Sequence, residues 1–151
     1  MDVIYRVVDF KTEKQLQKIL GLEKVNTKSY QKVKGGTLKP RPGTQLSSWS
    51  ANVRAMLYSG FFTVIPKNSH LLLLKAKIKG NKFFGNTETM AKKVADDSYQ
   101  LEKEAVGIGP IEYEEAVYGF RKPGQSLEGL LMDLTNMLSP VDEYDLLGKD
   151  W

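Results

Sequence analysis

The sequence predicts an α+β domain built mainly on antiparallel β-sheet. Strand-like segments outnumber helical ones, with about six strands against three or four helices, and hairpin-like connections join the strands. Strands and helices do not alternate as they do in a parallel α/β domain. The chain has no GxGxxG or Walker-type loop, which argues against a doubly wound dinucleotide fold and a P-loop enzyme. At 151 residues we expect one domain with a sizeable core.

Composition excludes several kinds of chemistry. Without cysteine, the chain can form neither a disulfide nor a thiolate nucleophile. The single histidine, His70, rules out a His-rich metal site and leaves little room for a Ser-His-Asp catalytic triad. The N-terminus lacks the regions of a signal peptide, and the longest apolar run, 71–74, is too short to span a bilayer. We therefore expect a cytoplasmic protein with no metal and no membrane partner.

Charge is distributed unevenly along the chain. The net charge is +4, but residues 1–95 carry +13 and residues 96–151 carry −9. A basic N-terminal part can hold the phosphates of a nucleotide cofactor or of a nucleic acid. It can equally be a lysine-rich solvated surface, or the two parts can complement each other electrostatically.

The first expected elements are a strand and a short helix. β-Branched and aromatic residues dominate residues 2–10, which predicts a strand. Arg6 interrupts it, and a charged residue there usually faces solvent or reaches a partner that needs a guanidinium fork. Residues 12–20 have the spacing of an amphipathic helix, with Thr12 at the N-cap position and Gly21 as a stop signal.

A basic loop, a serine-rich strand, a helix and a hairpin are expected in the middle of the chain. Glycine and proline indicate the loop at 24–45, with a short strand around 30–33. In the strand at 46–50, small hydroxyl residues alternate with Trp49. The helix and the two hairpin strands are expected at residues 51–58, 61–65 and 70–79. Alternation in the last of these predicts three lysines on one face: Lys75, Lys77 and Lys79.

The C-terminal part combines loops with a strand and a leucine-rich helix. The expected loop, helical piece, strand, helix and acidic tail span residues 80–99, 88–94, 111–120, 126–138 and 141–151. We expect the strand's glutamates to form its solvent face: Glu112, Glu114 and Glu115. Residues 1–124 are expected to form the core domain, with residues 125–151 packed on it or next to it.

Two carboxylates lie two residues apart in Glu102-Lys103-Glu104, at the expected start of a strand. Residues i and i+2 of a strand lie on the same face, so both side chains would point the same way. Such a pair suits a site that holds a sugar hydroxyl and stabilises a positive charge. Taken alone, the segment is also an ordinary exposed strand end.

Two further features precede this pair. Tyr5-Arg6 lies in the first strand, and Ser48-Trp49-Ser50 lies in the serine-rich strand before a helix. The order of an arginine, a Ser-x-Ser and a Glu-x-Glu resembles that of the R-S-E class of mono-ADP-ribosyltransferases. This family includes bacterial toxins, phage-encoded modifying enzymes and vertebrate ectoenzymes. The resemblance covers residues 3–120, and its most specific part is the segment around the two glutamates.

The resemblance implies a two-sheet, mainly antiparallel ADP-ribosyltransferase-like core with short flanking helices, and NAD as co-substrate. Arg6, with Tyr5 beside it, would contact the NAD phosphates. Ser48 would orient the catalytic glutamate and the nicotinamide side, and Ser50 would help structure the pocket. No residue is assigned to a metal.

The resemblance also divides the two carboxylates into different roles. Glu104 would be the catalytic glutamate, and Glu102 would be the upstream glutamate associated with arginine acceptors. The chemistry fits these residue types, because cleavage of the nicotinamide–ribose bond develops a positive charge on the ribose that a carboxylate stabilises. Nicotinamide leaves as a neutral molecule, so no general acid is needed. The expected function is transfer of ADP-ribose to an arginine of a target protein.

Departures from the family pattern leave alternatives open. Trp49 stands where the family usually has a small residue or threonine, and the chain is shorter than many members. The aromatic that stacks on nicotinamide is one of several candidates: Phe61, Phe62, Phe83 and Phe84. The same pocket could serve an NAD glycohydrolase or a nucleic-acid ADP-ribosyltransferase. A non-enzymatic module that binds nucleic acid through the lysine face of residues 70–79 is the third possibility.

Overall fold

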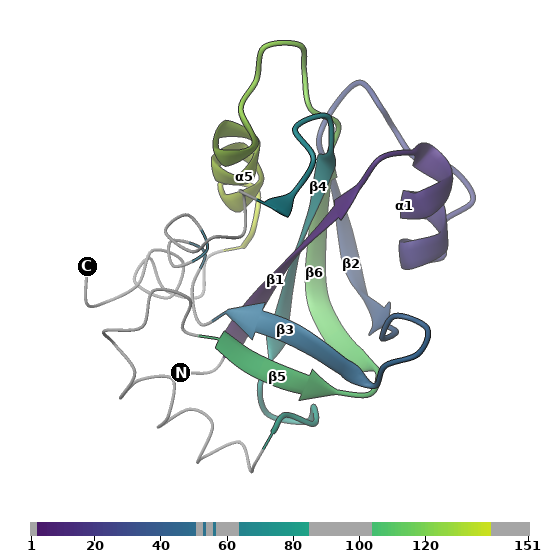
Figure 1. Ribbon diagram of the computed structural model, residues 1–151, viewed down its shortest axis with the longest axis vertical. Coiled ribbons are helices and arrows are strands. Elements are labelled where there is room, and N and C mark those ends of the chain that lie inside the picture. Colours follow the sequence, from purple (N-terminus) through teal and green to yellow (C-terminus); the bar gives the residue numbers. More distant parts are fainter. Residues whose placement is uncertain (1–2, 51–52, 54–55, 57–63, 85–103, 140–151) are drawn as a thin grey trace.

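The described chain folds into one antiparallel sheet flanked by two helices, which confirms the expected α+β class (Figure 1). The structure is a computed structural model and describes residues 3–50, 53, 56, 64–84 and 104–139. In this part the six strands have the order β2-β6-β4-β1-β3-β5. The strands are β1 (Val3–Phe10), β2 (Gln31–Leu38), β3 (Leu46–Ser50), β4 (His70–Lys77), β5 (Glu104–Ile108) and β6 (Ile111–Gly119). The helices are α1 (Glu13–Leu20) and α5 (Leu127–Thr135).

Helix α1 begins and ends where the sequence signals indicate. The side chain of Thr12 accepts a hydrogen bond from the backbone N–H of Gln15, and the Gln15 side chain accepts one from the backbone N–H of Thr12. This capping box satisfies two of the free amides at the start of the helix. Gly21 ends the helix in the left-handed conformation at φ 67°, which a glycine adopts without a steric penalty.

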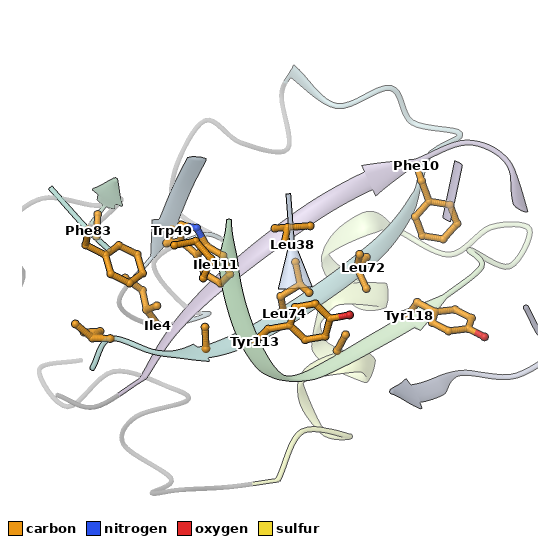
Figure 2. Packing of buried hydrophobic residues seen from close by; sticks show 14 of the residues in the cluster. Ile4, Phe10, Leu38, Trp49, Leu72, Leu74, Phe83, Ile111, Tyr113 and Tyr118 are labelled. Carbon is orange, nitrogen blue, oxygen red and sulfur yellow. The ribbon is translucent and has the colours of Figure 1, made fainter. Parts of the chain in front are cut away.

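Strand β4 lies at the centre of the molecule. It pairs along its length with β1 and β6, and the four leucines of Leu71–Leu74 are all fully buried. A strand whose neighbouring residues are all buried must be covered on both faces. One face carries the cluster built around Trp49, Phe83 and Tyr113, which Figure 2 shows along the strands. The other face packs against α5 and includes Tyr5.

The sheet changes direction between β1 and β3. Only one register pair, Tyr5 with Ser50, joins these two strands, whereas β3 and β5 pair over all five residues. Figure 1 shows the β3–β5 ribbon crossing away from the line of β1. The sequence predicted two sheets. The described part instead has one hydrogen-bonded sheet, in which a two-stranded ribbon is attached at a single position.

Strand β2 is the main element that sequence reasoning missed. Gly35 and Gly36 indicated a loop around a short strand, but residues 31–38 form a full strand along β6. A Cβ on Gly36 would lie 2.5 Å from the hydroxyl oxygen of Tyr113. This glycine therefore allows the tyrosine ring to lie against the neighbouring strand rather than marking a turn.

Helix α5 confirms a leucine-rich helix in the expected place, although it is shorter than predicted. Ser126 caps it, with its Oγ accepting a hydrogen bond from the amide of Gly129 at 3.0 Å. The buried leucines of α5 pack against β4 and β6. No helix in the described ranges is long and apolar enough to cross a membrane.

Some other predicted elements are tested only in part. Val53 and Met56 are helical, as expected for residues 51–58, but Val64 is helical rather than extended. A turn at residues 66–69 is confirmed by the hydrogen bond from the Ser69 amide to the Pro66 carbonyl at 3.0 Å. The helical piece at 88–94 and the tail at 141–151 lie outside the described residues.

A buried ion-pair network corrects two predictions about the surface. Lys75 is only 3% exposed, and its Nζ lies 2.8 Å from a carboxylate oxygen of Glu115. Lys32 contacts the same carboxylate at 2.6 Å, and Lys77 pairs with Glu114 at 3.3 Å. The predicted solvent face of three lysines does not form, because Lys75 is buried against Glu115 and β4 ends at Lys77, before Lys79. Glu115, only 9% exposed, is likewise not part of a solvent face.

Candidate functional site

Three neighbouring strands carry the residues that the sequence analysis selected. Arg6 lies on β1, Ser48 and Ser50 lie on β3, and Glu104 is the first residue of β5. These segments are far apart in the chain, and the order β1-β3-β5 makes them adjacent. Glu102 lies outside the described residues.

The register aligns one residue from each of the three strands. Tyr5 pairs with Ser50, and Ser50 pairs with Glu104. Neighbouring strands are separated by about 4.8 Å, so this row is about 10 Å wide from Tyr5 to Glu104. The structure therefore brings the serine motif and the downstream glutamate to the same level of the sheet.

Arg6 fills the notch where β1 and β3 separate. Continuing the antiparallel register beyond Tyr5 and Ser50 would pair Ser48 with Val7, but the strands have diverged there. Instead of a backbone hydrogen bond, the carbonyl of Ser48 accepts one from Nη1 of the Arg6 guanidinium at 2.7 Å. Arg6 thus links the arginine strand to the serine strand directly.

The guanidinium of Arg6 keeps unused donor capacity. Its Nε is buried without a hydrogen-bond partner, and no carboxylate among the described residues forms an ion pair with it. Burial, and secondly the positive charge of Arg41, lowers the pKa of Arg6 from its ordinary value to about 10. The side chain therefore remains charged at neutral pH. A half-buried cation without an acidic partner is suited to bind an anion from solution.

Arg41 is a candidate site residue that sequence reasoning missed. It lies in the turn between β2 and β3, where its carbonyl accepts a hydrogen bond from the Thr44 amide at 3.2 Å. Its charge acts on Arg6, so two cations face the same region. The available signal was an exposed arginine in a Gly- and Pro-rich loop directly before the serine strand, a position typical of ligand-binding residues.

Trp49, which stands where the family usually has a small residue or threonine, is a core residue in this structure. Its side chain is buried, its ring packs edge-on against Phe83 with centroids 6.3 Å apart, and its Nε1 donates to Ser47 Oγ at 2.9 Å. Because side chains alternate along a strand, anchoring Trp49 in the core places Ser48 and Ser50 on the opposite face. Trp49 therefore orients the Ser-x-Ser segment, and Ser47 satisfies the indole.

Tyr5 has a different position from that expected of a cofactor contact. Its side chain is fully buried in the cluster on the α5 face. This placement gives Tyr5 a packing role at the row containing Ser50, which lies on the same face. Arg6 alternates to the face of Trp49 and reaches β3 through the Ser48 backbone carbonyl. The next residue along the chain, rather than Tyr5 itself, can reach a ligand in the notch.

The candidate aromatics separate into core and surface. Phe83 is buried against Trp49, whereas Phe84 is 63% exposed. The amide of Phe84 donates to the Val106 carbonyl at 2.8 Å, which holds it beside β5. Leu46 and Ile108, which are opposite each other in the β3–β5 register, are also exposed. Phe61 and Phe62 lie outside the described residues.

Comparisons with known proteins gave no assignment: no family model matches the chain, and no similar curated protein or solved structure was found. Within the described ranges, no group of three or more acidic or histidine side chains could hold a metal ion. What the structure itself offers is a notch with a charged guanidinium, a second cation nearby, and a row of serine and glutamate positions on the adjoining strands.

Proposed function

We propose that this protein is an NAD-dependent mono-ADP-ribosyltransferase of the R-S-E class. The observation that carries the proposal is the contact of Arg6 Nη1 with the Ser48 carbonyl, in a sheet where Ser50 lies opposite Glu104. A chance match of three short motifs would not require their strands to be neighbours.

Each proposed role follows from a residue's position. Arg6 binds the pyrophosphate of NAD through its free donors, and Arg41 adds positive charge to the same region. The guanidinium of Arg6, which has no carboxylate partner in the described part of the chain, is the feature that an anionic ligand would bind. Ser48 and Ser50 serve as hydroxyl partners for the nicotinamide side of the ligand. Because they alternate to the face opposite Arg6, the ligand must reach both faces of the sheet where β1 and β3 diverge.

Glu104 has the catalytic role in this proposal. It accepts a hydrogen bond from the ribose 2′-OH and stabilises the positive charge that develops on the ribose. The glycosidic C–N bond breaks, its electron pair leaves with neutral nicotinamide, and a nitrogen of the acceptor guanidinium attacks the ribose carbon and loses a proton. Glu102 accepts that proton and orients the acceptor, the role that the resemblance implies for it.

Radiolabelled NAD incubated with cell lysate tests the proposal, with label on protein and free nicotinamide as the two readouts. Wild type should produce both. Glu104→Gln should reduce both by orders of magnitude without changing the thermal unfolding temperature, since it removes a reacting group rather than a core contact. Glu112→Gln, which alters an exposed glutamate of β6, is the matched control and should retain wild-type rates.

Other outcomes distinguish the alternatives. Nicotinamide release without labelled macromolecule would identify an NAD glycohydrolase. Label that resists protease but is removed by nuclease would identify a nucleic-acid acceptor. Absence of both nicotinamide release and label would refute the proposed activity. If label does appear on protein, Glu102→Gln should reduce transfer more than NAD hydrolysis, and equal losses would contradict its acceptor role.

A further inference from the structure

Two adjoining hollows lie between the loops at the other end of the sheet. Their volumes are about 490 Å³ and about 350 Å³, and both are lined by Thr27 and Lys28. The larger lies between the loop that leads into β2 and the strands β2 and β6, and the smaller lies between that loop and the loop that follows β6. The region joins the sheet at His70, whose Nδ1 accepts a hydrogen bond from the Arg121 amide at 2.8 Å.

This basic groove, defined by Lys24, Lys28, Arg121 and Lys122, is separate from the notch at Arg6. His70 pairs with Phe10 on β1, five positions beyond Tyr5. With a rise of about 3.4 Å per residue, the two regions are about 17 Å apart along the strands. A ligand in the groove would therefore not contact the row formed by Tyr5, Ser50 and Glu104.

No residue in the described part of the chain neutralises the charge of the groove. No acidic residue lines either hollow. None of the four cations forms an ion pair within the described part of the chain, in contrast to Lys32, Lys75 and Lys77. Arg121 donates from Nη1 to the Gln125 carbonyl at 2.8 Å, but its Nε is buried without a partner. The buried Arg121 Nε is out of reach of a ligand, so the lysines, which have no ion pair in the described part of the chain, are the donors open to an external anion.

Hydrogen bonds hold the walls of the groove in place. Asn26 Oδ1 accepts from the amides of Lys28 and Ser29 at 2.8 and 3.2 Å, and the Asn26 amide donates to the Tyr118 hydroxyl. On the opposite wall, Gln125 Nε2 donates to the Tyr30 hydroxyl at 2.9 Å. The lysines therefore project from ordered loops, which reduces the entropy lost when a ligand binds.

Aromatic side chains accompany these cations. Tyr118 lines the larger hollow but is only 3% exposed, whereas the half-buried Tyr30 and Phe120 line the smaller one. Lys122 lies over the Tyr30 ring, with its Nζ 5.6 Å from the centroid. Cations interleaved with aromatic rings are typical of surfaces that bind single-stranded nucleic acid, where phosphates meet the cations and bases stack on the rings. A duplex would not present its base faces to these rings.

We propose that the basic groove binds single-stranded nucleic acid. The four cations contact successive phosphates, and the half-buried Phe120 and Tyr30, rather than the buried Tyr118, contact unpaired bases. This binding does not depend on NAD or on the proposed transferase activity. It also moves the nucleic-acid surface away from β4, where Lys75 and Lys77 are neutralised by glutamates.

Fluorescence anisotropy with a labelled single-stranded oligonucleotide tests the groove. For four phosphate contacts the logarithm of the binding constant should fall with the logarithm of salt concentration with a slope of about −2.8. The charge-reversal pair Lys28→Glu and Lys122→Glu should weaken binding and reduce the slope to about −1.4. The matched control reverses Lys34 and Lys79, which are exposed lysines outside the groove, and should bind like wild type.

Three outcomes would overturn the proposal. Equal weakening in the groove variant and the control variant would show attraction to overall charge rather than to the groove. Equal or tighter binding of duplex, or of polyglutamate of matched charge, would refute specificity for a single strand. No measurable binding by a wild-type protein with a normal unfolding transition would refute the site altogether. Unfolding temperatures of both variants confirm that binding losses do not reflect misfolding.

Discussion

At the scale of single residues, Arg6 and Arg121 share an unusual environment. Each has a buried Nε without a hydrogen-bond partner, and neither has a carboxylate partner in the described part of the chain. Leaving a guanidinium donor buried and unbonded costs free energy. The buried Nε atoms themselves are out of reach of a ligand, but the absence of a carboxylate partner leaves the rest of each guanidinium able to bind an anion.

The role of Arg6 predicts a specific result for Arg6→Lys. Lysine retains the positive charge but cannot donate to the Ser48 carbonyl and to a phosphate through one rigid fork. We expect NAD binding to weaken by about thirtyfold, which corresponds to about 2 kcal/mol for charge-assisted hydrogen bonds. Isothermal titration calorimetry measures the change. Arg121→Lys is the control, because it makes the same substitution in the basic groove and should leave NAD affinity unchanged.

At the scale of elements, side-chain ion pairs add to the backbone hydrogen bonds that hold the sheet together. Glu115 on β6 accepts hydrogen bonds or ion pairs from Lys32 on β2, Lys75 on β4 and the Ser139 amide after α5. Burial acts to raise the pKa of Glu115, but the hydrogen bonds from Lys32, Lys75 and Ser139 outweigh it and lower the pKa from 4.5 to about 2. One carboxylate thus connects three strands to the C-terminal end of the described chain.

This network predicts how stability changes with pH. Because the folded-state pKa of Glu115 lies below its unfolded value, its ion pairs stabilise the fold above about pH 4.5, and this contribution is lost as the pH falls towards about 2. Glu115→Gln should lower the free energy of unfolding at pH 7 by about 3 kcal/mol, since Lys75 loses its buried partner. Urea denaturation should show the difference from wild type shrinking between about pH 5 and about pH 2.

The exposed glutamate of the same strand provides the control for that measurement. Glu112→Gln should change the free energy of unfolding by less than about 0.5 kcal/mol at any of these pH values. If Glu115→Gln were equally mild, the network would be a surface feature of little energetic weight. If its effect were the same at pH 3 as at pH 7, ionisation of Glu115 would not be the cause.

Elements with strong local signals were predictable from sequence, and those defined by distant contacts were not. Thr12 and Gly21 bracket α1 as their capping chemistry indicates. Strand β2 was missed because Gly35-Gly36 signals a turn locally, whereas the need for Gly36 comes from Tyr113, which is remote in sequence. The bend between β1 and β3 likewise depends on a single register pair that no local pattern encodes.

In the candidate site, too, only the features with a local sequence signal could be predicted. The sequence identified Arg6, Ser48, Ser50 and Glu104 by type and order, and the structure places them on adjacent strands. It gave no indication that Arg6 would bond to a backbone carbonyl of β3, or that Arg41 would share its surroundings, because both facts depend on how the strands diverge. Tyr5 was selected as a neighbour of Arg6, but alternation buries it on the other face.

At the scale of the whole molecule, the two ends of the sheet carry two different candidate sites. The notch at Arg6 lies where the β3–β5 ribbon diverges from β1. The basic groove lies beyond the C-terminal ends of β1 and β6. The central strands between them are buried on both faces and form a rigid core. Two ligands bound about 17 Å apart across such a core should stabilise the protein independently unless the sheet itself has two states.

This arrangement predicts that a substitution in one site reduces thermal stabilisation by its own ligand and leaves stabilisation by the other ligand unchanged. NAD at about one hundred times its dissociation constant should stabilise the wild type by about 2.7 kcal/mol, and an oligonucleotide at the same ratio should add a similar amount. Arg6→Lys should lose most of the NAD shift and keep the oligonucleotide shift, while Lys28→Glu with Lys122→Glu should do the reverse. A shift lost from both ligands in either variant would mean that the notch and the groove are one site, because independent sites require that each substitution affect only its own ligand.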